Sequence, residues 1–97
     1  MTLARVVSFS GVTNERMEEL TQRIRQDPRP NDIPASEMML LHDPDSETSL
    51  AILFFENEDD YRRGDATLDA MPADDTPGSR GGVTKYKVAF RVSASDM

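Results

Sequence analysis

The middle of the chain carries two apolar runs on either side of a short polar segment: MMLL at residues 38–41 and LAILFF at residues 50–55. Successive side chains of a β-strand point to opposite faces of a sheet, so an apolar residue at every position predicts a strand that needs cover on both faces. The segment DPDS at residues 43–46 has the composition of a turn, with proline at its second position. The pattern predicts a β-hairpin with strands over residues 37–42 and 49–56.

The first third of the chain predicts a strand followed by a helix. Residues 3–9 are rich in β-formers and lead into a Ser-Gly pair that is typical of a turn. Thr13 is a suitable N-cap, and apolar side chains then recur with helical spacing at Met17, Leu20 and Ile24. We therefore expect a helix over residues 14–26, which the proline-rich connector that follows cannot continue.

The last third predicts a second helix and a fourth strand. Asn57 is a suitable N-cap, the three acidic residues after it suit the positive end of a helix dipole, and Pro72 closes the helix. After a glycine-rich loop, residues 83–92 alternate: Thr84 and Tyr86 begin one side of this strand, and two lysines begin the other. The loop itself, with GSRGG at residues 78–82, is interpreted as mobile, because it precedes a strand and does not open a helix as a phosphate loop does.

The order strand, helix, strand, strand, helix, strand predicts one α+β domain over residues 1–97 with a ferredoxin-like fold. In this fold both helices cover one face of a four-stranded antiparallel sheet, and the other face stays bare. The hairpin nevertheless has apolar side chains on both faces, and exposing about six of them would forfeit about 1.5–3 kcal/mol each. We therefore expect a homodimer that packs sheet to sheet around a two-fold axis.

Composition restricts the partners further. The formal charge of −7 argues against nucleic acid, which attracts clustered lysine and arginine. The chain has no cysteine, so disulfides, thiolate metal sites and cysteine nucleophiles are excluded. No run approaches the roughly 20 apolar residues of a membrane helix, and no leader pattern opens the chain. These features predict a cytoplasmic protein that binds neither nucleic acid nor membrane.

The hairpin, the helix opening NEDDY at residues 57–61 directly after a strand, and the closing strand KYKVAF at residues 85–90 together resemble the dimeric α/β-barrel superfamily. That superfamily includes antibiotic biosynthesis monooxygenase-like domains and stress-responsive barrel proteins. The resemblance implies a homodimer with a ligand pocket between the helices and the sheet. It also implies cofactor-independent oxygenases or isomerases as relatives. Haem-binding members carry a ligating histidine on a helix, and neither predicted helix contains one, so we expect no cofactor and no metal.

Three side chains are candidates for proton transfer: Tyr61 and Asp65, one turn apart on the second predicted helix, and His42 beside Asp43 at a strand end. The structural alternatives are core packing for Tyr61, a half-solvated pair for Tyr61 with Asp65, and a hydrogen bond to its own turn for His42. Gly64 indicates either close packing or space for a ligand. The residues expected to line the pocket are Phe54, Tyr61, Gly64, Leu68 and Tyr86.

Charged residues elsewhere have simpler interpretations. Asp43, Asp45 and Glu47 lack the glycine and distal glutamate of a calcium loop and are interpreted as solvated turn carboxylates. The carboxylates at residues 56–60 suit capping of the second helix. Arg5, Lys85 and Lys87 would form a cationic strip if the first and last strands are neighbours, with protection of a sheet edge as the ordinary role of the lysines.

The sequence therefore favours a homodimeric domain that binds a small apolar or aromatic molecule. Two alternatives stay open. One is a cofactor-independent oxygenase or isomerase acting on a small aromatic or polyketide-like substrate through Tyr61, Asp65 or His42, and the other is a purely structural dimer with a filled core.

Overall fold

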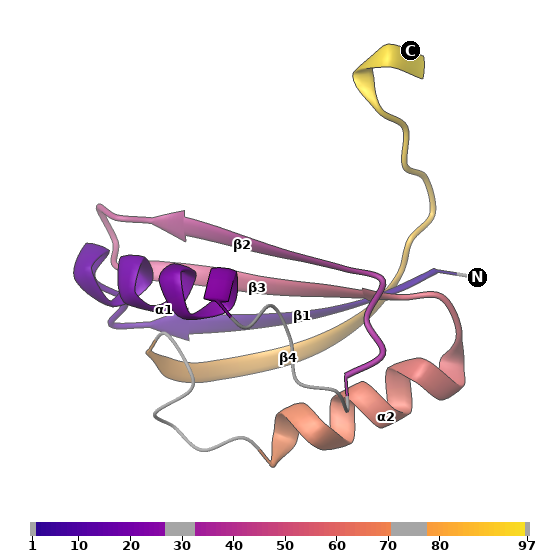
Figure 1. Ribbon diagram of the computed structural model, residues 1–97, viewed down its shortest axis with the longest axis horizontal. Helices are drawn as coiled ribbons and strands as arrows, with labels where there is room; N and C mark the ends of the chain where they lie inside the picture. The colour runs from indigo at the N-terminus through magenta and orange to yellow at the C-terminus, as the bar shows by residue number, and fades with distance from the viewer. Residues whose placement is uncertain (1, 27–32, 71–77, 97) are drawn as a thin grey trace.

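The computed structural model describes residues 2–26, 33–70 and 78–96. The elements follow one another as β1 (Leu3–Ser10), α1 (Asn14–Gln26), β2 (Glu37–Asp43), β3 (Thr48–Phe55), α2 (Glu58–Asp69) and β4 (Ser79–Lys87), with a short 3-10 helix η2 (Ala94–Asp96) near the end. Figure 1 shows the two helices lying along the sheet and the chain end leaving it. The predicted hairpin and both predicted helices are confirmed.

The four strands form one antiparallel sheet in the order β2-β3-β1-β4. The chain places its first and last strands side by side and its hairpin at one edge, which is the order of a ferredoxin-like α+β fold. Both helices contact the same face of the sheet: α2 contacts Arg5 and Phe55, and Met17 of α1 packs against the apolar cluster that contains Val7 and Phe9 of β1. The predicted fold class is confirmed.

Register defines two faces of this sheet, which we call the helix face and the open face. The helix face carries Leu3, Arg5 and Val7 of β1 and their partners Phe55, Leu53 and Ala51 of β3. The open face carries the alternate positions in four rows: Glu37, Phe54, Ala4 and Tyr86; Met39, Ile52, Val6 and Thr84; Leu41, Leu50 and Ser8; Asp43, Thr48, Ser10 and Ser79.

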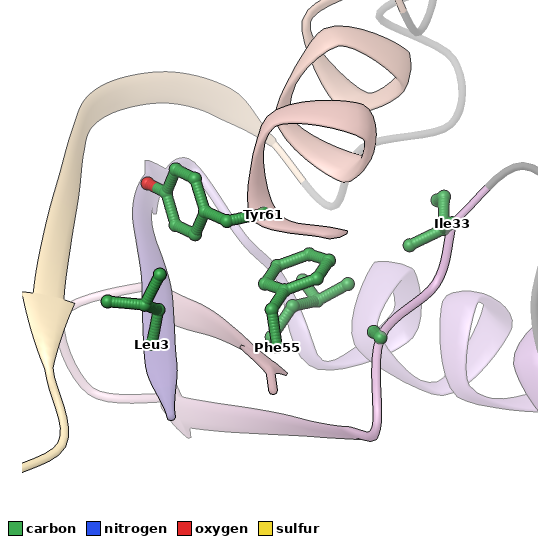
Figure 2. Packing of buried hydrophobic residues seen from close by; sticks show 6 residues of the cluster. Leu3, Ile33, Phe55 and Tyr61 are labelled. Atoms are coloured by element: carbon green, nitrogen blue, oxygen red, sulfur yellow. The ribbon is translucent and has the colours of Figure 1, made fainter. Parts of the chain in front are cut away.

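Two apolar clusters lie between the helices and the sheet. One surrounds the fully buried ring of Phe55 and contains Leu3, Ile33, Ala35, Leu53 and Tyr61, with Leu68 packed against it (Figure 2). The other surrounds fully buried Val12 and contains Val7 and Phe9, with Met17 and Ala51 beside them. The clusters therefore lie near opposite ends of β1, one under each helix.

Both helices start at the predicted caps. The Thr13 hydroxyl accepts a hydrogen bond from the Arg16 amide at 3.1 Å, and the Asn57 side-chain oxygen accepts one from the Asp60 amide at 2.8 Å. These oxygens satisfy amides that have no partner within the first turn of a helix. In α2 the first turn also places Glu58, Asp59 and Asp60 at the positive end of the dipole, as expected.

The fourth strand differs from its prediction. It spans Ser79–Lys87, whereas alternation predicted residues 83–92. Strand pairing explains the shift, because Ser79 and Arg80 pair with Ser10 and Phe9 at one end, while β1 begins at Leu3 at the other. The Val88 amide still donates to the Thr2 carbonyl at 3.0 Å, and then β1 offers no further partner. The predicted loop at residues 73–82 was wrong at its end, because residues 79–82 belong to β4, while residues 73–77 lie outside the described residues. Most of the predicted connector at residues 27–34 also lies outside them.

Candidate functional site

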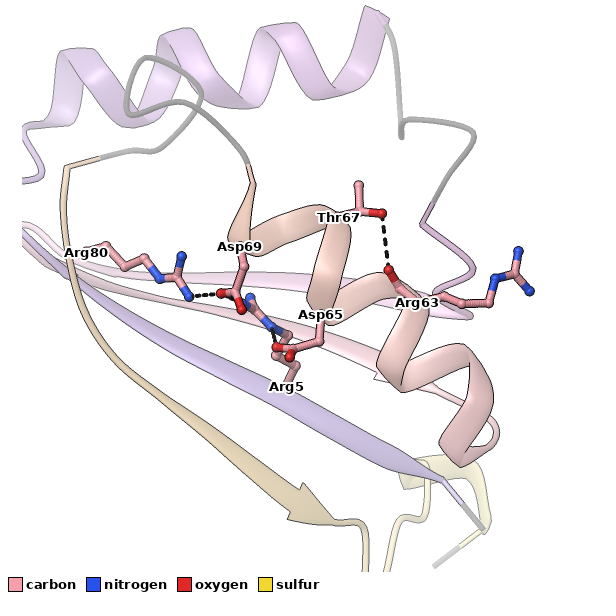
Figure 3. Close-up of polar contacts among 6 residues, drawn as sticks. All are labelled: Arg5, Arg63, Asp65, Thr67, Asp69 and Arg80. Carbon is pink, nitrogen blue, oxygen red and sulfur yellow. Dashed lines mark hydrogen bonds and ion pairs between the residues drawn. The ribbon is translucent and has the colours of Figure 1, made fainter.

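A buried arginine joins α2 to the sheet. Arg5 lies on the helix face with 3 % of its side chain exposed. Its Nε donates to Asp65 Oδ1 at 2.7 Å, and its Nη2 donates to Asp69 Oδ1 at 3.2 Å (Figure 3). A guanidinium removed from water needs such charged acceptors, because an unpaired buried charge is very costly. The two carboxylates, one helical turn apart, fix α2 above β1.

The expected cationic strip is present, and acidic residues of α2 pair with it. Arg5, Lys85 and Lys87 share the helix face, because Lys85 pairs with Arg5 and Lys87 with Leu3 in the β1–β4 register. Lys85 forms an ion pair with Glu58, and Arg80 forms one with Asp69. Lys85 therefore has a specific partner on the helix in addition to its place on an edge strand.

These ion pairs lower the pKa values of two carboxyl groups. The hydrogen bond from Lys85 is the main reason that the pKa of Glu58 lies below its ordinary value. The hydrogen bond from Arg80 does the same for the pKa of Asp69, helped by the charges of Arg80 and Arg5. Both carboxyl groups are therefore ionised in the folded protein at neutral pH.

Tyr61 is part of the core cluster and is held among charged groups. Its ring packs edge-on against Phe55 with centroids 5.4 Å apart, and Lys85 Nζ lies 4.8 Å from its centroid. Figure 2 shows the Tyr61 hydroxyl on the side of the ring turned away from Ile33. Burial, with a smaller effect from the charge of Asp65, raises the pKa of Tyr61 above its ordinary value. The phenol is therefore neutral at physiological pH, cannot act as a base there, and keeps its proton as a hydrogen-bond donor.

Gly64 faces the core one turn beyond Tyr61. A Cβ at position 64 would overlap the ring atoms Cε1 and Cζ of Phe55, which is fully buried. Of the two explanations that the sequence allowed for this glycine, the structure gives close packing of α2 on β3. Leu68, one turn further, is partly buried against the same cluster.

The five residues expected to line one pocket lie on two faces of the sheet. Tyr61, Gly64 and Leu68 are on α2 and pack onto the helix face of the sheet. Phe54 and Tyr86 lie on the open face, where they flank the small, buried side chain of Ala4 in one row. The structure therefore does not bring these five residues together, because Phe54 and Phe55 are neighbours in a strand and point in opposite directions.

His42 lies at the other end of the sheet from Tyr61 and Asp65. Its Nε2 is 3.1 Å from the Val12 carbonyl, so Nε2 carries the proton and donates to a neighbouring segment. The structural alternative expected for His42, a hydrogen bond to its own turn, is therefore replaced by a bond to Val12. His42 pairs with Ser49 and Ser49 with Phe9, whereas Tyr61 packs near Leu3. The six residue-to-residue steps from Leu3 to Phe9 span about 20 Å of strand, so the three candidates for proton transfer do not form one group.

The turn carboxylates behave as the sequence indicated. The Asp43 side chain accepts from the Asp45 amide at 3.1 Å, in the manner of an Asx turn. A hydrogen bond from Ser46 is the main cause that lowers the pKa of Asp43. Asp43 also lies on the opposite face from His42, so the carboxylate does not orient the imidazole.

The site that sequence reasoning missed is a shallow depression on the open face, next to the hairpin turn. Its volume is about 560 Å³. Most of its lining side chains have open-face positions, and Gly81 faces them from β4, since a Cβ there would overlap the Ser8 hydroxyl. The lining residues are Ser8, Phe9, Ser10, Leu41, His42, Asp43, Thr48, Ser49, Leu50 and Gly81. The signals in the sequence were small residues on β1 and β4 opposite a hairpin that is apolar on both sides.

The described residues limit the chemistry of these sites. Within residues 2–26, 33–70 and 78–96, no three His, Asp or Glu side chains are grouped so that they could hold a metal ion. No helix in these ranges has the length and apolar character that crossing a bilayer requires.

Comparisons of the chain with protein-family models, curated proteins and solved structures gave no significant match.

Proposed function

We propose that the protein is a homodimeric binding domain in which the open faces of two copies pack together around a small, neutral, mostly apolar molecule. The observation that carries this proposal is the open face itself, which is apolar, uncharged at its centre and hollowed at one end. The β-α-β-β-α-β order, which resembles that of the dimeric α/β-barrel superfamily, supports the same assembly.

Apolar side chains on the open face are exposed in the single chain. Met39, Leu41, Leu50 and Tyr86 are 41, 45, 37 and 54 % exposed, and they lie in adjacent rows. Exposed apolar area costs about 25 cal/mol per Å², and contiguous patches of this kind mark interaction surfaces. Burying this face against another apolar face therefore stabilises the folded chain.

The distribution of charge favours a second copy as the occupant. Each chain carries −7, so two copies repel each other at most orientations. Within the described strands, charged side chains of the open face lie only at its two ends: Glu37, which is paired with Arg91, and Asp43. Sheet-to-sheet packing thus brings two acidic chains together through the surface where they repel least.

The size of the face also suits a dimer. An eight-residue strand and four strands side by side measure about 26 by 19 Å, or about 500 Å² in projection. The accessible area of a surface with side chains exceeds its projection. The face therefore approaches the roughly 800 Å² per partner of a stable interface.

The lining of the depression indicates the class of ligand. Leu41 and Leu50 provide apolar walls, the hydroxyls of Ser8 and Thr48 provide hydrogen-bonding groups, and the Asp43 carboxylate disfavours anions. A small neutral molecule with an apolar body and one or two polar groups matches this surface. We therefore propose that the binding site lies at the interface of the two copies.

Sedimentation analysis tests the assembly. We expect a dimer at micromolar concentration, and we expect Leu41→Glu to shift the protein to monomer, because two carboxylates would enter the apolar interface. Gln22→Glu adds the same charge to an exposed position of α1 and should leave the dimer intact. A wild-type chain that sediments at 10.9 kDa throughout this range would contradict the proposal.

Fluorescence of N-phenyl-1-naphthylamine, a neutral aromatic probe, tests the binding site. We expect emission to rise with the wild-type dimer and with Gln22→Glu, and to stay at the level of free probe with Leu41→Glu. Equal enhancement by the monomeric variant would place the probe outside the interface and contradict the proposed site.

A further inference from the structure

We infer that Phe90 of each copy covers the depression of its partner and supplies the apolar wall that a single chain lacks. This inference rests on the proposed homodimer and assigns to it a residue that crosses between the copies. It concerns the segment after β4, residues 88–92, which we call the C-terminal arm.

Phe90 is placed where its own chain cannot bury it. Its side chain is 81 % exposed, the highest value among the large apolar side chains that the structure describes. The next residue, Arg91, is turned back toward its own sheet: its guanidinium lies 5.0 Å from the Phe54 centroid and pairs with Glu37. The Phe90 ring makes little contact with its own chain and projects into solvent beside this anchored arginine.

The arm and the depression lie at opposite ends of the same face. Arg91 contacts the row of Glu37 and Phe54, which contains Ala4 of β1, whereas the depression includes Ser8 of the same strand. Four residues of strand separate these rows, about 13 Å. Figure 1 shows the chain leaving β4 at that end and passing beyond the edge of the sheet.

A two-fold axis between the faces and perpendicular to the strands reverses the strand direction of one copy relative to the other. The arm end of each copy then lies over the depression end of its partner, so the contact occurs twice. With this symmetry each outward phenyl ring meets the apolar walls of Leu41 and Leu50. The ring has no charge to desolvate, and it covers Leu41 and Leu50, which are 45 and 37 % exposed in the single chain.

The volume of the depression leaves space for a ligand beneath the ring. A value of about 560 Å³ lies within the range of roughly 300–1,000 Å³ for small-molecule sites, and one phenyl ring occupies only part of it. In this arrangement the ligand contacts the sheet of one copy and the aromatic ring of the other. The site is therefore complete only in the dimer.

A single tryptophan tests the contact, because the chain has none. In Phe90→Trp, we expect indole emission to shift to shorter wavelength over the concentration range in which sedimentation shows the dimer forming. Gln22→Trp, on the exposed side of α1, serves as the matched control and should show no shift. Solvent-like emission from position 90 in a protein that is dimeric would overturn the inference and leave the proposed dimer standing.

A mutant cycle provides the second test. We expect Phe90→Ala to weaken dimerisation about 10-fold or more, as for an apolar anchor, and to abolish the probe fluorescence of residual dimer. In a Leu50→Ala background, Phe90→Ala should weaken dimerisation much less, because the contact between Phe90 and Leu50 is already reduced. Independent effects of the two changes would overturn the inference, and a wild-type protein that is monomeric throughout would overturn both proposals.

Discussion

The two faces of the sheet belong to the same four strands, yet they differ in where they carry charged side chains. The covered helix face contains a buried arginine with two carboxylate partners, and a lysine paired with a glutamate. The open face, within the described strands, is uncharged between its end rows and leaves leucine and methionine in water. Charged side chains thus lie on the covered face and apolar side chains on the exposed one, which is the reverse of a simple apolar interior and charged surface.

The difference follows from what lies on each face. On the helix face, α2 carries acidic residues at positions 58, 65 and 69, all within reach of cations on β1 and β4. Ion pairs between elements restrict the rotation and register of α2 as well as its distance from the sheet. On the open face the described chain supplies such a partner at one end, where Arg91 pairs with Glu37, so apolar contacts must hold whatever packs on the centre of that face.

The largest expected effect separates two adjacent phenylalanines. Phe55→Ala should lower the free energy of unfolding by about 3–5 kcal/mol, because Phe55 is fully buried beneath Gly64 and Tyr61. Phe54→Ala, one residue away on the open face, should cost about 1 kcal/mol in the single chain. Urea unfolding of both variants, at a concentration below that of dimer formation, measures the contrast. Equal losses would show that the two faces do not differ in packing.

A smaller effect is expected from the buried arginine. Arg5→Met should lower the free energy of unfolding by about 2 kcal/mol, less than for a wholly buried pair because Asp65 and Asp69 are 37 and 54 % exposed. Arg16→Met removes the Arg16–Glu19 pair on the surface of α1 and should cost less than about 1 kcal/mol. Urea midpoints of the two variants provide the comparison, and a loss for Arg5→Met no greater than for Arg16→Met would contradict a fixing role for Arg5.

The smallest expected effect is a dependence on acid. The folded pKa values of Glu58 and Asp69 lie below the ordinary values of 4.5 and 3.8, so the stabilisation from these groups is present above those values. It should be lost as the pH falls through the lower, folded pKa values. Urea midpoints measured between pH 6 and pH 3 should therefore decrease.

The matched control for this dependence is the double variant Lys85→Met and Arg80→Met, which removes the main cause of each shift. Its midpoint should fall less steeply over the same interval. An unchanged slope would show that other carboxyl groups are responsible for the acid sensitivity.

Much of the fold could be predicted from local patterns. The caps at Thr13 and Asn57 and the doubly apolar hairpin depend on neighbouring residues, and each is present as expected. The strip of Arg5, Lys85 and Lys87 was predicted on the condition that β1 and β4 are neighbours, and they are. Sequence reasoning succeeded where alternation or spacing alone determines the position of a side chain.

The rest depended on pairing between distant segments. Alternation extends to Val92, but β4 ends at Lys87 because β1 has no residue left to pair with it. The hydrogen bond of His42 to Val12 needs the register of β2 and the return of the chain into α1. The depression, too, depends on how Gly81 faces Ser8 across a register shift, which no pattern along one strand reveals.

The Arg91 side chain links parts of the molecule that are far apart in the sequence. It belongs to the segment that follows β4 at one edge of the sheet, and it contacts Phe54 of β3 and Glu37 of β2, the strand at the opposite edge. The two outer strands, which share no backbone hydrogen bonds, are thereby connected through one guanidinium. Fraying of either outer strand at this end of the sheet breaks the Arg91 contacts, so the segment that follows β4 contributes to the stability of both edges there.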